Sequence, residues 1–188
     1  MNKTFFTQLE LLSLGFKSLG ENVLVSRLAS IISPEKISLG DNSRIDDFCV
    51  LTGEITIGAY VHISAHCSLF GESGIYIDDN SGISSQSIIY STSDDFSGNA
   101  LVGPQVSSEY RNVIKKRVII EKFVQIGAVS VVMPGVVAHE GAVTGAYTFV
   151  KTELPAWTIS AGIPSKVIKE RSQKVLELVG RLKNEKSY

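Results

Sequence analysis

The sequence predicts an all-β solenoid, a parallel β-helix of hexapeptide repeats that carries an extruded loop and ends in an α-helix. Aliphatic residues recur at every sixth position, small or β-branched residues recur four positions after them, and one long segment breaks both patterns. A period of six matches neither the ~3.6 residues of a helical turn nor the alternation of a flat strand. It is typical of short strands that turn a corner every six residues.

The aliphatic positions predict the interior of the solenoid. Fourteen of the sixteen positions are Ile, Leu or Val, although these types make up 53 of the 188 residues in all. The positions are Leu39, Ile45, Leu51, Ile57, Ile63, Leu69, Ile75, Ile77, Ile83, Ile89, Ile120, Ile126, Val132, Ala138, Thr144 and Val150. Three such faces make a coil of 18 residues, apart from a two-residue slip at Ser73 and Gly74. Neighbouring coils are expected to stack as parallel strands about 4.8 Å apart.

Residues 1–30 precede the repeats and are expected to form an N-terminal helical cap and lead-in. Apolar residues at helical spacing favour an amphipathic helix with one apolar side. These residues are Phe5, Leu9, Leu12 and Phe16. Polar residues interrupt the apolar run, so a signal peptide is the less favoured interpretation.

The repeats are expected to cover residues 31–163, with an extruded loop at residues 91–117 where the period is lost. Solenoid walls are repetitive and a loop extruded from one is seldom needed for stability, so this loop is predicted to bind substrate. Residues 164–188 are expected to form a C-terminal helix, because Pro164 suits a first helical turn and apolar residues recur after it.

The composition excludes several classes of protein. The net charge of −1 and a pI near 6.3 argue against a nucleic-acid partner, and no apolar run approaches the ~20 residues of a membrane span. Cys49 and Cys67 are one coil apart, so they are expected to lie one above the other. A disulfide between them is sterically conceivable, but free buried thiols in a cytoplasmic protein are favoured.

Three stretches resemble the hexapeptide-repeat acyltransferases, whose fold is a left-handed parallel β-helix. Residues 77–95 and 118–169 align without gaps with the galactoside and maltose O-acetyltransferase branch, and the second stretch contains Ala-Gly-Ile-Pro-Ser-Lys at 161–166. The run Tyr-Ser-Thr-Ser-Asp-Asp-Phe-Ser-Gly at 90–98 is similar to acetyltransferases encoded with O-antigen and capsule sugars. The resemblance alone implies the left hand, because general chirality rules favour right-handed crossovers.

The resemblance implies an acetyl-CoA-dependent O-acetyltransferase that acts on a sugar hydroxyl in surface-polysaccharide biosynthesis, such as that of lipopolysaccharide or capsule. It also implies a homotrimer with active sites between subunits, with acetyl-CoA as donor substrate and no metal required. N-acetylation of a nucleotide-linked amino sugar stays open as the alternative, since a neutral amine is nucleophilic without a protein base.

The catalytic residues are the point at which the sequence departs from the family. Asp94 stands where the galactoside enzymes carry a histidine that deprotonates the acceptor hydroxyl. Asp94 would serve as a base only if burial or its neighbour Asp95 raised its pKa. His62 is expected on the outer wall at a substrate-site position of the family. We therefore predict His62 as the base, with Asp94 or Asp95 orienting it from the same subunit or its neighbour.

The resemblance also implies where coenzyme A binds. Ala128 and Ala146 would offer backbone contacts to the pantetheine arm, and their small side chains would allow its close approach. Lys151, Lys166 and Lys169 would meet the phosphates. These positions predict a cofactor site along the last coils.

Two other classes of protein on this scaffold are disfavoured. A zinc enzyme of the γ-class carbonic anhydrase type needs three convergent histidines, and the spacing of His62, His66 and His139 does not bring them together. A non-catalytic solenoid would repeat a flat outward motif. Here the outer positions are irregular and a loop interrupts them.

Overall fold

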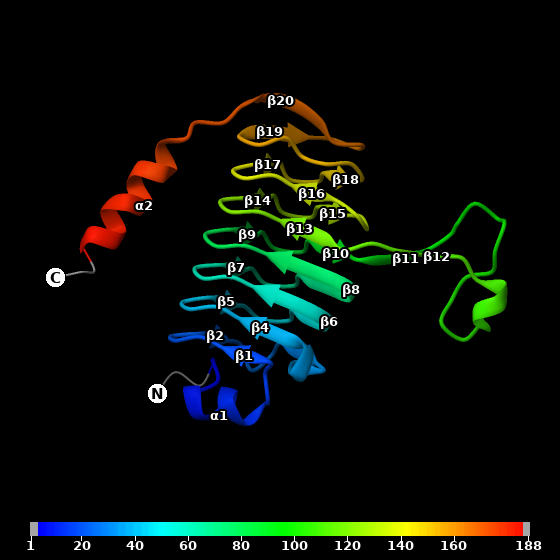
Figure 1. Ribbon diagram of the computed structural model, residues 1–188, viewed down its shortest axis with the longest axis horizontal. Coiled ribbons are helices and arrows are strands. Elements are labelled where there is room, and N and C mark those ends of the chain that lie inside the picture. Colours follow the sequence, from blue (N-terminus) through cyan, green and yellow to red (C-terminus); the bar gives the residue numbers. More distant parts are fainter. Residues whose placement is uncertain (1–3, 186–188) are drawn as a thin grey trace.

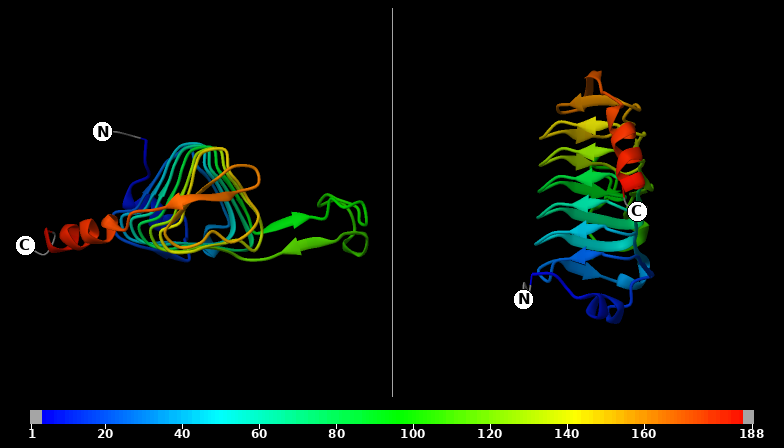
Figure 2. Two further views of the ribbon diagram at one scale, coloured as in Figure 1. Left: turned by 90° about the horizontal axis from the view of Figure 1, so that it is seen from above. Right: turned by 90° about the vertical axis from the view of Figure 1, so that its left-hand side faces the viewer.

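The computed structural model describes residues 4–185, which form a left-handed parallel β-helix as predicted. Figure 1 shows the coils stacked from the N-terminal to the C-terminal end, and Figure 2 shows them superimposed as a triangle when viewed along the stack. A short helix lies at the first coil, a β-hairpin closes the last, and a second hairpin projects from one corner.

Two sheets make the walls of the triangle. The larger sheet contains β1 (Ser18–Leu19), β3 (Ser30–Ile32), β4 (Ile37–Leu39), β6 (Val50–Ile57), β8 (Ser68–Ile77), β10 (Ile88–Tyr90), β13 (Val118–Ile120), β15 (Val131–Val132), β16 (Val137–Ala138) and β18 (Phe149–Val150). The smaller sheet contains β2 (Leu24–Val25), β5 (Arg44–Ile45), β7 (His62–Ile63), β9 (Gly82–Ile83), β14 (Gln125–Ile126), β17 (Val143–Thr144), β19 (Thr158–Ala161) and β20 (Lys166–Glu170). The remaining elements are α1 (Gln8–Ser13), η1 (Pro34–Lys36), β11 (Thr92–Asp94), η2 (Ser108–Tyr110), β12 (Val113–Lys115) and α2 (Lys174–Glu185).

The six-residue period fills the interior as expected. All sixteen repeat positions are at most 3% exposed. Ile45 pairs with Ile63, 18 residues later. Across the slip at Ser73 and Gly74 the spacing becomes 20 residues, as in the pair of Ile57 with Ile77. The two extra residues therefore lengthen one coil without disturbing which side chains point inward.

The expected N-terminal cap is wrong in two respects. The helix is a single short segment, α1, whose buried side chain is Leu11, while Leu9 and Leu12 are 80% and 61% exposed. The coil begins at Ser18 in β1 and not at residue 31. Leu19 and Val25 already continue the six-residue period, so the lead-in is itself a coil.

The expected helix from Pro164 is also wrong at its start. The chain first forms β20, which pairs antiparallel with β19, and α2 begins at Lys174. The guanidinium of Arg171 donates to the carbonyls of Phe123 and Gly141 and lies over the Trp157 ring, which fixes this segment to the last coils. Helix α2 then projects away from the triangle (Figures 1 and 2). None of the helices within residues 4–185 has the length and apolar character needed to span a membrane.

Candidate active site

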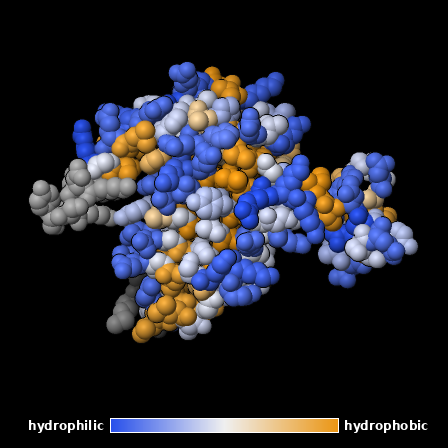
Figure 3. All heavy atoms as spheres, viewed as in Figure 1, coloured by the Kyte–Doolittle hydropathy of each residue, from blue (hydrophilic) through white to orange (hydrophobic). Residues whose placement is uncertain are grey.

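Residues 91–117 leave the coil as a braced hairpin, which we call the arm. Strands β11 and β12 pair antiparallel, with Asp94 opposite Val113. Buried Ser91 anchors the base, because its hydroxyl accepts from the Ser73 amide and donates to the Phe70 carbonyl at 2.8 and 2.9 Å. Figure 3 shows the arm standing out from the coil with hydrophobic and hydrophilic side chains intermixed.

The Asp94 carboxylate is held by two donors within the arm. The guanidinium of Arg111 donates through Nη2 to Oδ1 at 2.8 Å, and the Gly103 amide donates to Oδ2 at 3.1 Å. The Arg111 hydrogen bond, followed by that of Gly103, lowers the pKa of Asp94. The structure therefore contradicts the idea that burial or Asp95 raises this pKa. Asp94 is a fixed anion at neutral pH.

Asp95 points elsewhere along the arm. Its carboxylate accepts from the Ser97 amide at 2.8 Å and from the Asn112 side chain at 2.9 Å, and these bonds lower its pKa. Asp95 does not line the cleft beneath the arm. The two adjacent aspartates thus have different surroundings, and Asp94 is the one that faces a binding cleft.

An open cleft of about 1070 Å³ lies between the arm and the coil. Asp94, Phe96 and Arg111 line it from the arm. The stacked rings of Phe70 and Tyr90, 5.2 Å apart, line it from the wall. The cleft is large enough for a nucleotide-linked sugar or for part of coenzyme A.

Charged residues of both signs line this cleft. Glu54 and Glu72 line it from the wall, and Lys17, Glu35 and Lys36 line it near the N-terminal end of the coil. None of these residues was predicted from the sequence. Glu54 and Glu72 are 18 residues apart, the usual coil length, and this spacing was the available signal that they share one wall.

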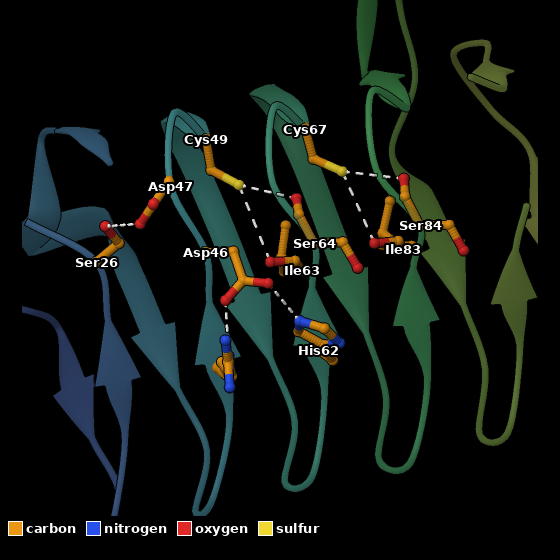
Figure 4. A network of polar contacts seen from close by, with 11 residues as sticks. Ser26, Asp46, Asp47, Cys49, His62, Ile63, Ser64, Cys67, Ile83 and Ser84 are labelled. Carbon is orange, nitrogen blue, oxygen red and sulfur yellow. Dashed lines mark hydrogen bonds and ion pairs between the residues drawn. The ribbon is translucent and has the colours of Figure 1, made fainter. Parts of the chain in front are cut away.

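His62 lies on the outer wall as predicted, with half of its side chain exposed. Its Nε2 contacts Oδ2 of Asp46 at 2.8 Å (Figure 4). Nε of Arg44 donates to the other carboxylate oxygen, Oδ1, at 2.6 Å. Partial burial opposes ionisation of Asp46, but the bonds from His62 and Arg44 outweigh it and lower the pKa of Asp46. Within this chain Asp46 therefore orients His62, and neither Asp94 nor Asp95 does.

His62 borders a second, smaller hollow of about 220 Å³, which Ser84 also lines. This hollow is on the smaller sheet, whereas the arm leaves from the larger sheet. Of the predicted catalytic residues, Asp94 lines the larger cleft, His62 borders the smaller hollow, and Asp95 lines neither. A single chain does not bring His62 together with Asp94.

The other two histidines contact neighbouring side chains, and the two cysteines are buried. His66 stacks on Phe48 at 4.9 Å, and His139 contacts Glu121 at 3.2 Å. Cys49 and Cys67 are free and buried, and Figure 4 shows them in matching positions of successive coils. Nowhere in residues 4–185 do three or more His, Cys, Asp or Glu side chains gather in a way that would hold a metal ion.

The predicted coenzyme A residues lie at the C-terminal end of the coil. Ala128 and Ala146 occupy corresponding turns of successive coils. The backbone amide of Tyr147 donates a hydrogen bond to the carbonyl of Ala128 between these two turns. Among the described residues, the amides of Ala128 and Ala146 donate no hydrogen bond. Lys151 follows β18, and Lys166 and Lys169 lie on β20, all three exposed.

Comparison with known proteins identifies the class. No family model matches the sequence. The chain is 45% identical over 177 residues to the dTDP-4-amino-4,6-dideoxy-D-glucose acyltransferase of Escherichia coli, which covers 93% of this chain and 92% of that protein. The chain belongs to the hexapeptide-repeat acyltransferase family, as the resemblance implied. It is an acyltransferase.

The chain is also similar to solved structures of an N-acyltransferase. AntD, an N-acyltransferase from Bacillus cereus in complex with dTDP and 3-hydroxybutyryl-CoA, superimposes with a TM-score of 0.97 at 46% identity, over 99% of this chain and 100% of that one. AntD structures with dTDP and coenzyme A include the D94A and S84T variants in that protein's numbering.

A more distant relative represents the O-acetyl branch. WbbJ of Escherichia coli K12, named for O-acetyl transfer in lipopolysaccharide biosynthesis, is 28% identical over 152 residues, which cover 75% of this chain and 72% of that protein. The relatives thus favour the amino-sugar alternative over the predicted O-acetylation.

Proposed function

We propose that this acyltransferase moves an acyl group from coenzyme A to the amino group of a nucleotide-linked amino sugar, with dTDP-4-amino-4,6-dideoxyglucose as the acceptor. The observation that carries the proposal is Asp94, a carboxylate held as an anion at the cleft where the O-acetyl branch has a histidine base. An anion of this kind attracts an ammonium group and is a poor base for a hydroxyl. The similarity to the Escherichia coli enzyme, which is named for this sugar, and to AntD, whose S84C variant was crystallised with it, supports the same acceptor.

The chemistry needs no strong protein base. The ammonium group first loses one proton to solvent, and the neutral amine then attacks the thioester carbonyl to form a tetrahedral intermediate. The carbon–sulfur bond then breaks, and a second proton passes from the nitrogen to the departing thiolate, so the products are an amide and the free thiol of coenzyme A. Asp94 would orient the nitrogen, and backbone amides near the coil edge would stabilise the oxyanion.

The donor would lie along the last coils. The unused amides of Ala128 and Ala146 suit the carbonyl groups of pantetheine, and three exposed lysines at this end suit its phosphates. The donor would be acetyl-CoA or a longer acyl-CoA, because AntD was crystallised with 3-hydroxybutyryl-CoA.

The complete site would require more than one copy of the chain. The arm with Asp94 and the hollow with Ser84 lie on different walls, and AntD variants have been made at an aspartate 94 and a serine 84. A homotrimer with sites between subunits would join the two hollows. The cytoplasmic location and the role in surface-polysaccharide assembly stay predictions.

The test is the rate of thiol release from acetyl-CoA with two matched acceptors, dTDP-4-amino-4,6-dideoxyglucose and the same sugar nucleotide with a hydroxyl at position 4. The proposal expects turnover with the amine and none above background with the hydroxyl. His62→Ala is measured in parallel and is expected to retain the amine activity within about threefold. Turnover of the hydroxyl acceptor, lost in His62→Ala, would instead support the predicted O-acetyltransferase.

A further inference from the structure

Arg111 occupies an unusual position in the arm. It comes after β11 and the outer loop, 17 residues beyond Asp94 in the sequence, yet the hairpin brings the two side chains to 2.8 Å. Both side chains are about four-fifths buried, and both line the cleft. The pair therefore belongs to the cleft and not to the solvent-exposed edge of the arm.

The pairing is not the one that stability alone favours. Arginine and carboxylate commonly form two parallel hydrogen bonds. Here Arg111 uses Nη2 on Oδ1, while Gly103 occupies Oδ2, and the buried Nε of Arg111 has no partner among the described residues. An unpaired buried donor costs stability. In this arrangement Nε of Arg111 makes no hydrogen bond, but the Asp94 carboxylate is held at each of its two oxygens by a different donor.

This fixation leaves acceptor capacity on Asp94. A carboxylate has about four lone-pair sites, and two are used within the arm. The remaining sites are available to donors in the cleft. A carboxylate accepts hydrogen bonds but has none to give when ionised, so a group with several N–H donors and a positive charge is its best partner.

We propose that Arg111 is a positioning residue that holds the Asp94 carboxylate in one orientation at the cleft, and that this fixed anion selects an amine over a hydroxyl acceptor. The inference rests on the proposed function. Arg111 acts through Asp94 and does not contact the reacting nitrogen.

A double-mutant comparison tests this coupling. Arg111→Gln is expected to lower kcat/KM for the amino sugar about tenfold or more in the wild-type background, because a charge-assisted hydrogen bond is lost. In the Asp94→Asn background the same change is expected to alter kcat/KM by less than about twofold. Arg111→Lys, which keeps a charged donor, is expected to recover part of the loss.

Asn112→Ala is the matched control. Asn112 also braces the arm, through Asp95, but it does not touch Asp94 or line the cleft. Its effect is expected to be small and equal in both backgrounds. If Asp94→Asn has no measurable turnover, calorimetric binding of the amino sugar relative to dTDP alone provides the same comparison.

The possible outcomes distinguish failure of the role inferred for Arg111 from failure of the proposed function. An equal loss from Arg111→Gln in both backgrounds would show that Arg111 only maintains the fold of the arm, and would overturn the inference. Absence of wild-type turnover with any amino-sugar nucleotide would instead overturn the proposed function. Retained amine turnover together with background-dependent loss supports both.

Discussion

Replacing Asp94 by asparagine removes its charge while keeping its size, and we expect this change to lower kcat/KM for the amino sugar about tenfold to hundredfold. Asp94 accepts one hydrogen bond on each oxygen, from Arg111 and from Gly103. Asparagine offers one acceptor and one donor group, so it satisfies only one of these donors. It also loses the charge-assisted contact to the ammonium group, which accounts for the expected factor.

The assay is the initial rate of thiol release at saturating acetyl-CoA with varied dTDP-4-amino-4,6-dideoxyglucose. In a second series, with the amino sugar saturating and acetyl-CoA varied, the KM for acetyl-CoA is expected to stay within about twofold, since the D94N variant of AntD was crystallised with both dTDP and coenzyme A. Asp95→Asn removes the same charge at the neighbouring residue and is expected to lower kcat/KM for the amino sugar by less than about threefold. A loss in Asp95→Asn equal to that in Asp94→Asn, or no loss in either, would refute the reasoning.

Three further predictions concern stability, and each is measured by chemical unfolding. Leu69→Ala, at a fully buried repeat position, is expected to cost about 2–5 kcal/mol; a loss under 1 kcal/mol would contradict a close-packed interior. Gly53→Ala is expected to cost more than about 2 kcal/mol, because φ is +87° and the new Cβ would lie 2.5 Å from the carbonyl carbon of Gly71 in the next coil. Glu10 has its pKa lowered to about 2, first by Arg27 and then by the Thr7 capping bonds. Because this folded-state pKa is below the unfolded value, its stabilising effect is full above about pH 4.5 and is lost as the pH falls towards 2. The difference in stability between wild type and Glu10→Gln should therefore shrink over that range, and a constant difference would rule out the ionic contact with Arg27.

The interior of the fold was predictable because each face of a narrow solenoid has room for few inward side chains. Leu51 and Leu69 each fill one face of one coil, so burial imposes the six-residue period directly on the sequence. The ends were not predictable in this way. The hairpin of β19 and β20 depends on Arg171, whose partner carbonyls at Phe123 and Gly141 are 48 and 30 residues away.

The candidate site was predictable in part. The break in the period located the arm, and of the two adjacent aspartates predicted there Asp94 lines the cleft whereas Asp95 does not. The contact of His62 with Asp46 follows from the coil register, because Arg44 pairs with His62. The partnership of Asp94 with Arg111 had no such signal, since it depends on how a non-repetitive segment folds back on itself.

The most direct test of the account is the chemical identity of the acylated product. The product formed from acetyl-CoA and dTDP-4-amino-4,6-dideoxyglucose would be isolated, weighed by mass spectrometry and treated with neutral hydroxylamine, which cleaves esters and leaves amides intact. We expect a single acetyl group that resists this treatment and is attached to nitrogen. An acetyl group released by hydroxylamine would place it on oxygen and would contradict the proposed function.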